Sequence, residues 1–225
     1  MSAPTLGFVL PVLNESDGIT LRLNDLAARF PGVPRIVVDG GSSDQTVANA
    51  MHHCEQLLIG QAGRARQMNL GAAGVDAEFL VFLHADTEPQ FDLAWLQQQL
   101  TERPVWGFCP VLLSGRHWLL RWVERGINWR SRASGVGTGD QMIFVRKDIF
   151  LAQQGFADMP LMEDVELSKR LRRIARPQVL GRPVLTSSRR WEQRGILRTV
   201  IQMWGLRFGY WVGLSPQRLW RAYYG

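Results

Sequence analysis

Short apolar runs recur along the first part of the chain and are typical of strands in a buried sheet. They cover residues 5–11, 35–39, 56–59 and 78–83. Segments with helical patterns lie between them, over residues 16–30, from about residue 43, and over residues 63–73. Strands that alternate with helices favour a mostly parallel sheet with helices on both faces. The pattern therefore predicts an α/β fold.

The first of these helices carries the clearest signals. Ile19, Leu23, Leu26 and Phe30 recur at helical spacing, and Ser16 suits the N-cap position. We expect the apolar face of this helix to pack on the sheet.

The pattern beyond residue 100 is more mixed. Strands suit residues 105–113 and 141–145, and helices suit residues 117–130, a segment from residue 147, and residues 162–174. No internal repeat or low-complexity linker divides the chain. We therefore expect one domain over residues 1–194, followed by an aromatic, amphipathic helical tail over residues 195–225.

The charge balance narrows the classes of partner. The formal net charge is +6, and basic residues, nearly all arginine, crowd the last third of the chain. Nucleic acid, an anionic membrane surface and a phosphorylated small molecule would each complement this charge. The two cysteines form no CxxC pair, so neither a zinc site nor a redox motif is expected, and a cytoplasmic location is the default. The sequence shows no signal-peptide pattern and no run of 18 apolar residues.

Polar and acidic residues follow three of the predicted strands at the point where each ends. Asn14 and Glu15 follow the first strand, Asp39 ends the second, and His84-Ala85-Asp86 follows the strand at 78–83. Ligands of parallel sheets bind beyond the carboxyl ends of the strands. We therefore expect a binding site at this edge.

Each of these segments has a structural and a functional interpretation. Asp39 could accept hydrogen bonds from a base or a ribose, and Gly41 would let a ligand approach the backbone, but the same residues suit a tight strand-to-helix turn. His84 and Asp86 have the ligand types and spacing for a divalent ion, but they also suit a polar strand end.

Two later segments carry further candidates. Glu163 and Asp164 stand at a predicted helix start, where they could supply a general base or only complement the helix dipole. Arg190 and Trp191 could clamp a diphosphate and stack on a sugar, or form a solvated basic turn.

Taken together, these segments resemble the family-2 glycosyltransferases with the GT-A fold. The matching segments are residues 11–15 (PVLNE), 39–46 (DGGSSDQT), 63–71 (GRARQMNLG), 84–86 (HAD), 139–145 with 155–156, 163–164 (ED) and 190–191 (RW). The resemblance covers about residues 5–192, and HADT, MEDVEL and SRRW resemble a subgroup of small bacterial members.

The resemblance implies an inverting transfer of a sugar from a UDP- or GDP-sugar to an acceptor hydroxyl, with Mn²⁺ or Mg²⁺ on the diphosphate. It implies a donor-binding half over residues 1–100 and an acceptor half over residues 101–194. The implied donor-binding residues are Pro11, Asn14, Glu15, Asp39, Gly41, Ser42, Arg66, Ala85 and Asp86. The implied metal ligands are Asp86 and His84, the implied base is Asp164, and the implied acceptor-binding residues are Gly139, Asp140, Glu163, Arg190 and Trp191.

This sequence departs from the family pattern at two positions, and other functions stay open. His84 stands where the metal motif has Asp, and Leu13 replaces an aromatic residue that is frequent before Asn-Glu. A nucleotidyltransferase would need a phosphate loop rich in Gly and Lys near the N-terminus, which residues 11–15 do not supply. A nucleic-acid-binding protein would need basic and aromatic residues alternating on one exposed face. A sugar-binding module without catalysis would not need both Asp86 and Asp164.

The tail predicts a helix with two unlike faces. One face collects Ile196, Leu197, Val200, Ile201, Trp204, Phe208 and Trp211. The other face has Gly205, Gly209 and Gly213, whose spacing permits close approach of another helix. The tail is too polar for a membrane span, so it would lie on a membrane surface, which suits a lipid-linked acceptor, or pack on the protein's own core or in a homodimer.

Overall fold

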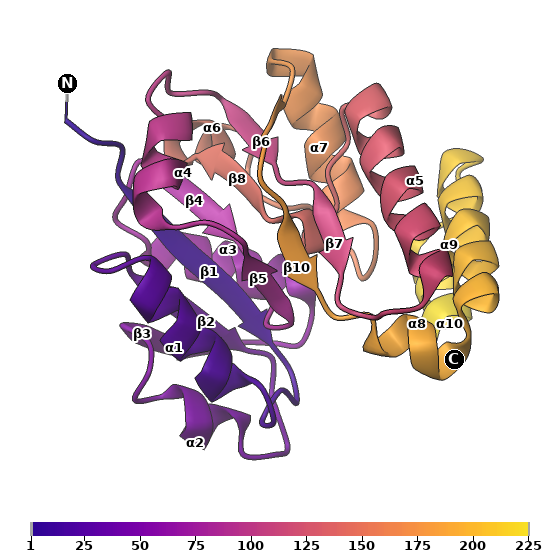
Figure 1. Cartoon of the computed structure of the whole chain (residues 1–225), viewed down its shortest axis with the longest axis horizontal. Helices are drawn as coiled ribbons and strands as arrows, with labels where there is room; N and C mark the ends of the chain where they lie inside the picture. The colour runs from indigo at the N-terminus through magenta and orange to yellow at the C-terminus, as the bar shows by residue number, and fades with distance from the viewer. Residues whose placement is uncertain (1, 225) are drawn as a thin grey trace.

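The computed structural model describes residues 2–224 and is built on a seven-stranded sheet (Figure 1). The strand order is β3 (Gln56–Ile59), β2 (Arg35–Asp39), β1 (Leu6–Val12), β4 (Phe79–Phe82), β8 (Ile143–Arg146), β6 (Trp106–Phe108) and β9 (Gln178–Val179). Of these strands, β8 alone runs antiparallel to its neighbours β4 and β6. This mostly parallel sheet confirms the predicted fold class.

A second sheet of three short strands stands beside the first. Its order is β5 (Thr87–Pro89), β10 (Val184–Thr186) and β7 (Val111–Leu113). The strand predicted over residues 105–113 is wrong as one continuous strand, because β6 and β7 belong to different sheets. Pro110 lies between them, and its missing N–H cannot continue a ladder, although its carbonyl accepts from the N–H of Val184.

Helices cover both faces of the large sheet, as the alternation of β1 requires. Phe8 and Leu10 face a core shared with α1 (Ile19–Arg29), α2 (Thr46–Ala50) and α4 (Leu93–Gln99). Val9 faces the other way, toward α3 (Arg64–Gly74), α6 (Lys147–Ala152) and α7 (Glu163–Ile174). Successive side chains of a strand point to opposite faces, so one short strand anchors both cores.

Helix α3 lies unusually close to the sheet. Gly71 makes this possible, because a Cβ there would come within 2.5 Å of Val9 Cγ1. One turn earlier, the buried Gln67 amide donates to the carbonyls of Val12 and Val38, each at 2.8 Å. A single side chain thereby joins the carboxyl ends of β1 and β2, where the candidate site begins.

The remaining helices stand at one end of the molecule. They are α5 (Trp118–Ser134), α8 (Arg189–Arg194), α9 (Ile196–Trp211) and α10 (Pro216–Tyr224), and α9 lies against α5, α8 and α10 (Figure 1). The predicted tail is therefore helical, but it is divided between α9 and α10. None of the helices in residues 2–224 has the length and apolar character needed to cross a bilayer.

Two further boundaries differ from the sequence-based predictions. The helix expected from about residue 43 begins at Thr46, because the Asp44 carboxylate accepts from the Thr46 N–H and holds the preceding residues in a turn. The strand expected over residues 141–145 begins at Ile143, because residues Gly139–Gln141 form a 3₁₀ turn and Met142 has a φ of 47°.

Candidate active site

The loops after β1 and β2 form one hydrogen-bonded unit. The Asn14 N–H donates to Ser42 Oγ at 2.8 Å, and the Ser43 N–H donates to Asn14 Oδ1 at 2.9 Å. The Glu15 N–H donates to Thr46 Oγ1 at 2.7 Å. These bonds fix the direction in which Glu15 leaves the end of β1.

Asp39 organises this unit from below. It is buried, and its Oδ2 accepts from the N–H groups of Gly41 and Ser42 at 2.8 and 2.9 Å. Gly41 has a φ of 93°, in the region that favours glycine. The sequence left a turn and a ligand contact open for Asp39; these bonds establish the turn, and donor binding stays a prediction.

A cleft of about 390 Å³ opens between these loops and the second sheet. Asn14, Glu15, Ala85 and Asp86 line it on one side, and Thr186, Ser187 and Arg189 line it on the other. A volume of this size lies in the range of small-ligand sites, roughly 300–1,000 Å³. The structure thus brings together four of the predicted donor-binding residues from two different strand ends.

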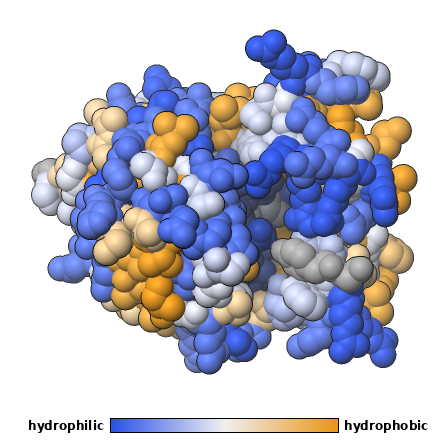
Figure 2. Space-filling view, turned by 90° about the horizontal axis from the view of Figure 1, so that it is seen from below, coloured by the Kyte–Doolittle hydropathy of each residue, from blue (hydrophilic) through white to orange (hydrophobic). Residues whose placement is uncertain are grey.

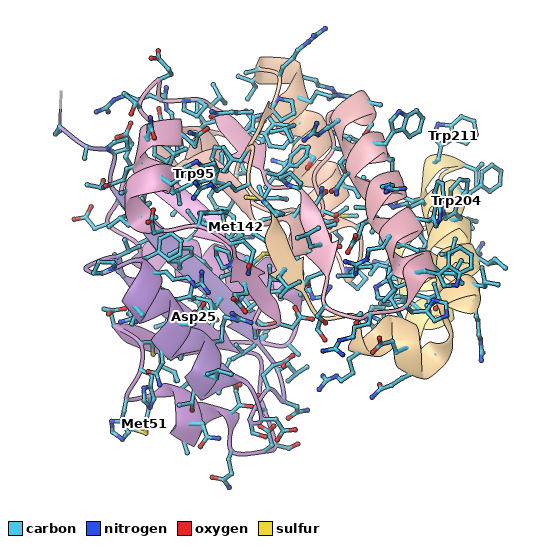
Figure 3. All side chains as sticks on the ribbon, in the orientation of Figure 1. Asp25, Met51, Trp95, Met142, Trp204 and Trp211 are labelled. Carbon is cyan, nitrogen blue, oxygen red and sulfur yellow. The ribbon has the colours of Figure 1, made fainter. Side chains whose placement is uncertain are left out.

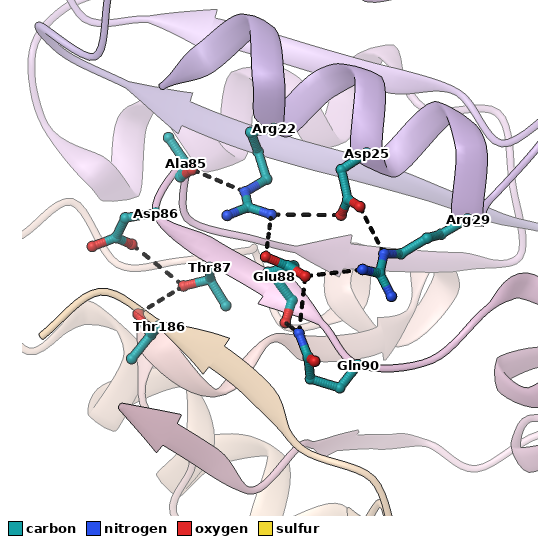
Figure 4. Close-up of polar contacts among 9 residues, drawn as sticks. All are labelled: Arg22, Asp25, Arg29, Ala85, Asp86, Thr87, Glu88, Gln90 and Thr186. Carbon is teal, nitrogen blue, oxygen red and sulfur yellow. Dashed lines mark hydrogen bonds and ion pairs between the residues drawn. The ribbon is translucent and has the colours of Figure 1, made fainter. Parts of the chain in front are cut away.

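Residues on both sides of the cleft make hydrogen bonds to residues 85–87, the segment that carries Asp86 (Figure 4). On the α1 side, Arg22 Nε donates to the Ala85 carbonyl at 3.2 Å, and Arg22 also pairs with Glu88. On the other side, the hydroxyls of Thr87 and Thr186 share a hydrogen bond of 3.0 Å. The carboxylate of Asp86 is therefore presented into the cleft by a segment anchored at both ends.

Acidic groups concentrate in the cleft. Burial raises the pKa of Glu15, and the neighbouring Asp86 carboxylate raises it further. Burial also raises the pKa of Asp86, with Arg64 opposing and Asp140 adding to the rise. Part of the Asp86 side chain is accessible to solvent, but protein atoms surround it in the concave wall of the cleft, so its carboxylate is still partly desolvated. A cation or a metal ion would relieve this repulsion.

Arg64, the first residue of α3, is one cationic group of this region, and Arg189 is another. The charge of Arg64 acts on Glu15, Asp86 and Glu163 alike. Arg66, the arginine that the sequence motif predicts for donor binding, is half exposed and pairs with Asp158 at 2.8 Å. A shift of two residues turns a helical side chain by about 200°, so Arg64 and Arg66 leave α3 on nearly opposite sides, and a binding test of each decides which one contacts the donor.

The Glu163–Asp164 pair opens α7 on the far side of the sheet edge. Asp164 Oδ2 accepts from the Gly139 N–H at 2.7 Å, and its Oδ1 accepts from the Val165 N–H at 2.7 Å. Burial raises the pKa of Asp164, and burial together with Asp164 raises the pKa of Glu163 to about 7. Two adjacent carboxyl groups of raised pKa, one of them held by two backbone donors, are suited to accept a proton.

His84 lies nearer to this pair than to the cleft. Its imidazole packs against Gly139, where a Cβ would come within 2.5 Å of His84 Cε1. With Met68, Phe82 and Asp164 it lines a small second cavity, while Asp86 lines the cleft. Burial lowers the pKa of His84 to about 3, so its imidazole is neutral at pH 7. The expected convergence of His84 and Asp86 on one ion is therefore not visible in these two cavities.

The remaining predicted residues take varied positions. Pro11 lies inside β1, paired with Val38, one residue before the strand ends. The charge of Asp140 acts on both acidic groups, because it adds to the rise in the pKa of Asp86 and of Asp164. Arg190 lies over the ring of Tyr223 at 3.9 Å, and Trp191 is half-buried on α8.

Arg189 belongs to the same basic segment, 187–191, from which the sequence singles out Arg190, and it is Arg189 that lines the cleft. It is the residue before the motif, and nothing in the order of the two arginines indicated which one faces the ligand. Within residues 2–224, no three His, Cys, Asp or Glu side chains form a group that could hold a metal ion without other ligands. A metal at Asp86 would need oxygen ligands from a substrate and water.

Comparisons with known proteins agree with this geometry. Residues 8–110 match the family model described as glycosyl transferase family 2. No curated protein matches the sequence of the chain.

Solved structures share the fold at low identity. A mycobacterial protein has 17% identity and a TM-score of 0.57, covering 82% of this chain and 65% of its own. TarS from S. aureus, in complex with UDP, has 19% identity and a TM-score of 0.64, covering 81% of this chain and 60% of its own. Glucosyl-3-phosphoglycerate synthase from Mycobacterium tuberculosis, in complex with Mn²⁺, UDP-glucose and glycerol 3-phosphate, has 20% identity and a TM-score of 0.55, covering 78% of this chain and 69% of its own. This chain therefore spans less than two thirds of the first two.

Proposed function

We propose that the chain is a glycosyltransferase that moves a sugar from a nucleotide-diphosphate sugar to an acceptor hydroxyl with inversion, a proposal supported by the match of residues 8–110 to the glycosyl transferase family 2 model. The observation that carries the proposal is the arrangement of two acidic groups at one sheet edge. Asp86 faces an open cleft, and Asp164 is held rigidly on α7, with the charge of Asp140 acting on both.

The donor would lie in the cleft beside the joined loops of β1 and β2. Asn14 and Glu15 would contact the nucleoside there, with Asp39 and Ser42 shaping the turn beneath it. Arg64 and Arg189 would face the diphosphate, because the charge of Arg64 acts on Asp86 and the side chain of Arg189 lines the cleft. Arg22 also lines the cleft, but it already contacts the Ala85 carbonyl and Glu88. A guanidinium binds two phosphate oxygens at once, which favours arginine in this position.

The site also fits a divalent metal ion through Asp86. The M. tuberculosis neighbour was crystallised with Mn²⁺ and with Mg²⁺. Hard cations of this kind bind proteins through one or two carboxylates and take their other ligands from substrate phosphates and water. Asp86 supplies one accessible carboxylate in a field made negative by Glu15 and Asp140. When bound, such an ion would offset the negative charge that grows on the departing diphosphate.

Asp164 is the proposed base of the transfer. It would accept the proton of the acceptor hydroxyl while the acceptor oxygen bonds to the anomeric carbon and the bond from that carbon to the diphosphate oxygen breaks. The bonding electrons leave with the nucleoside diphosphate. Gly139 and Val165 hold the carboxylate in place through their N–H groups, and its raised pKa makes it a better proton acceptor than an exposed Asp.

The test is a thermal-shift screen of the purified chain. UDP, GDP, CDP and dTDP are each added with and without Mn²⁺, because a ligand that binds the native state raises the melting temperature. We expect one nucleotide to raise it, and Mn²⁺ to increase the rise. Asp86→Asn should lose the part that depends on Mn²⁺. Asp76→Asn is the matched control, because Asp76 is exposed before β4, at the opposite end of that strand.

An equal rise in Asp86→Asn and in the parent chain would remove Asp86 from the metal. No rise with any nucleotide diphosphate, with or without Mn²⁺, would contradict the proposed donor class.

A further inference from the structure

The outer surfaces of α5, α9 and α10 expose an unusual number of aromatic side chains. Six of the nine tryptophans of the chain are exposed, and all six lie on these three helices. We call the following exposed set the aromatic face: Trp118, Trp122, Trp129, Leu197, Ile201, Trp204, Phe208, Trp211, Leu214 and Trp220.

These side chains are not core residues left partly covered. Helix α9 already packs its other side inward, where Leu206 joins Leu219, Met162 and Val165 in a buried cluster. Trp204 and Trp211 point outward from α9, away from the sheets (Figure 3). They are 76% and 77% exposed, and apolar surface follows this edge of the molecule in Figure 2.

The glycines of the tail do not change this. Gly209 packs closely against Leu214 and Leu219, so its close approach serves α10. A Cβ at Gly205 would meet nothing within 4 Å, and Gly213 lies beyond the end of α9. Of the three glycines predicted to allow close helix packing, only Gly209 does so, and the side chains of the aromatic face remain exposed.

The charges on α9 and α10 are all positive, and the nearest acidic residue in the sequence, the exposed Glu192, lies on α8. Residues 193–225 contain five arginines and no acidic residue. On α5 the one acidic side chain, Glu124, is buried and pairs with Arg121 at 2.9 Å. Arg125 lies over the ring of Trp122, and Arg132 and Arg198 are exposed beside the same helices.

From this combination we propose that the aromatic face docks the chain on the surface of a bilayer that contains anionic lipid. Tryptophan side chains favour the interface between lipid and water, and arginines are attracted to anionic headgroups. The helices would lie in the plane of the surface, as amphipathic helices with one apolar and one basic side do. The proposal is independent of the sugar-transfer reaction.

The charge argues against a second copy of the chain as the occupant. A two-fold interface places the same surface on both partners, so it would bring arginine-rich faces together without acidic groups to pair with them. A bilayer with anionic headgroups supplies the opposite charge across the whole face.

The test is co-sedimentation of the full chain with two kinds of vesicle, phosphatidylcholine alone and phosphatidylcholine with phosphatidylserine. We expect the chain to pellet with the anionic vesicles at low salt and to be released as salt screens the charges. The double variant Trp204→Ser/Trp211→Ser should lower the partition coefficient by about tenfold or more, because two interfacial anchors are lost.

The matched control is Met51→Ser/Leu151→Ser, which removes two exposed apolar side chains from α6 and the end of α2. It should bind like the parent chain, and circular dichroism checks that both double variants are folded. A parent chain that stays in the supernatant, or a tryptophan variant that binds as well as the control, overturns the proposal. So does a dimer in analytical ultracentrifugation that dissociates in the tryptophan variant while vesicle binding is absent.

Discussion

Replacing Gln67 by Leu removes the amide that joins the ends of β1 and β2. Gln67 is 3% exposed, and its Nε2 donates to the carbonyls of Val12 and Val38 at 2.8 Å each. Leucine fills a similar volume and has no donor, so the variant isolates the two hydrogen bonds from the packing.

The expected loss of stability depends on which hydrogen-bond partners the two carbonyls retain in the variant. The Val12 carbonyl also accepts from the Gly40 N–H at 3.0 Å, so it retains one partner. A buried hydrogen bond contributes about 1 kcal/mol net, and leaving a buried acceptor without its partner costs about 1–3 kcal/mol. We therefore expect the free energy of unfolding to fall by about 2–4 kcal/mol. For a chain of this length that lowers the melting temperature by roughly 5–15 °C.

Chemical denaturation followed by circular dichroism measures this change. Gln202→Leu is the control, because the Gln202 amide makes one exposed bond of 3.3 Å to the Ala222 carbonyl, and its loss should change stability by no more than about 0.5 kcal/mol. A Gln67→Leu variant as stable as the control would refute the argument that this amide holds the strand ends together.

Three further predictions concern the candidate site. Asp164→Asn should retain the melting-temperature rise with the donor nucleotide but lower transfer by roughly 10²-fold or more, since it removes the general base; near-parental turnover would eliminate Asp164 from that role. Arg64→Ala should weaken nucleotide binding at least tenfold by titration calorimetry, whereas Arg66→Ala should leave it within about twofold, because Arg64 acts on the cleft carboxylates and Arg66 pairs with Asp158 instead. Burial and the neighbouring Asp164 raise the pKa of Glu163 from 4.5 to about 7, with Arg64 opposing the rise. Between these two pH values the folded state binds a proton that the unfolded state has lost. The free energy of unfolding should therefore fall as the pH rises from about 4.5 to about 7. Glu163→Gln should flatten that fall, and an unchanged slope would contradict the assignment.

Several parts of the fold followed from local patterns. The alternation of short apolar runs and amphipathic segments predicted β1, β2 and β4 and the helices between them, because period and burial are readable one element at a time. The placement of acidic residues after these strands predicted the site edge for the same reason.

Other parts depended on contacts between distant segments. Pro110 marks a break within residues 105–113, but nothing local shows that the two halves join different sheets, because β7 pairs with β10 more than 70 residues later. Whether Arg64 or Arg66 acts on the cleft carboxylates depends on the side from which each leaves α3, because Arg66 turns to Asp158. The position of His84 depends on Gly139, which approaches from another part of the chain.

The close packing of α3 on the sheet at Gly71 links the position of this residue to the position of Arg64 at the start of the helix. A methyl group added at residue 71 would meet Val9 Cγ1 at 2.5 Å and Val38 Cγ2 at 2.9 Å, so the helix would have to lift from the strands. At 1.5 Å of rise per residue, Arg64 lies about 10 Å further along the same rigid rod. A substitution at residue 71, which contacts no ligand, would therefore move the positive charge of Arg64 away from the cleft. Larger residues at position 71 should then weaken the binding of anions at the other end of α3.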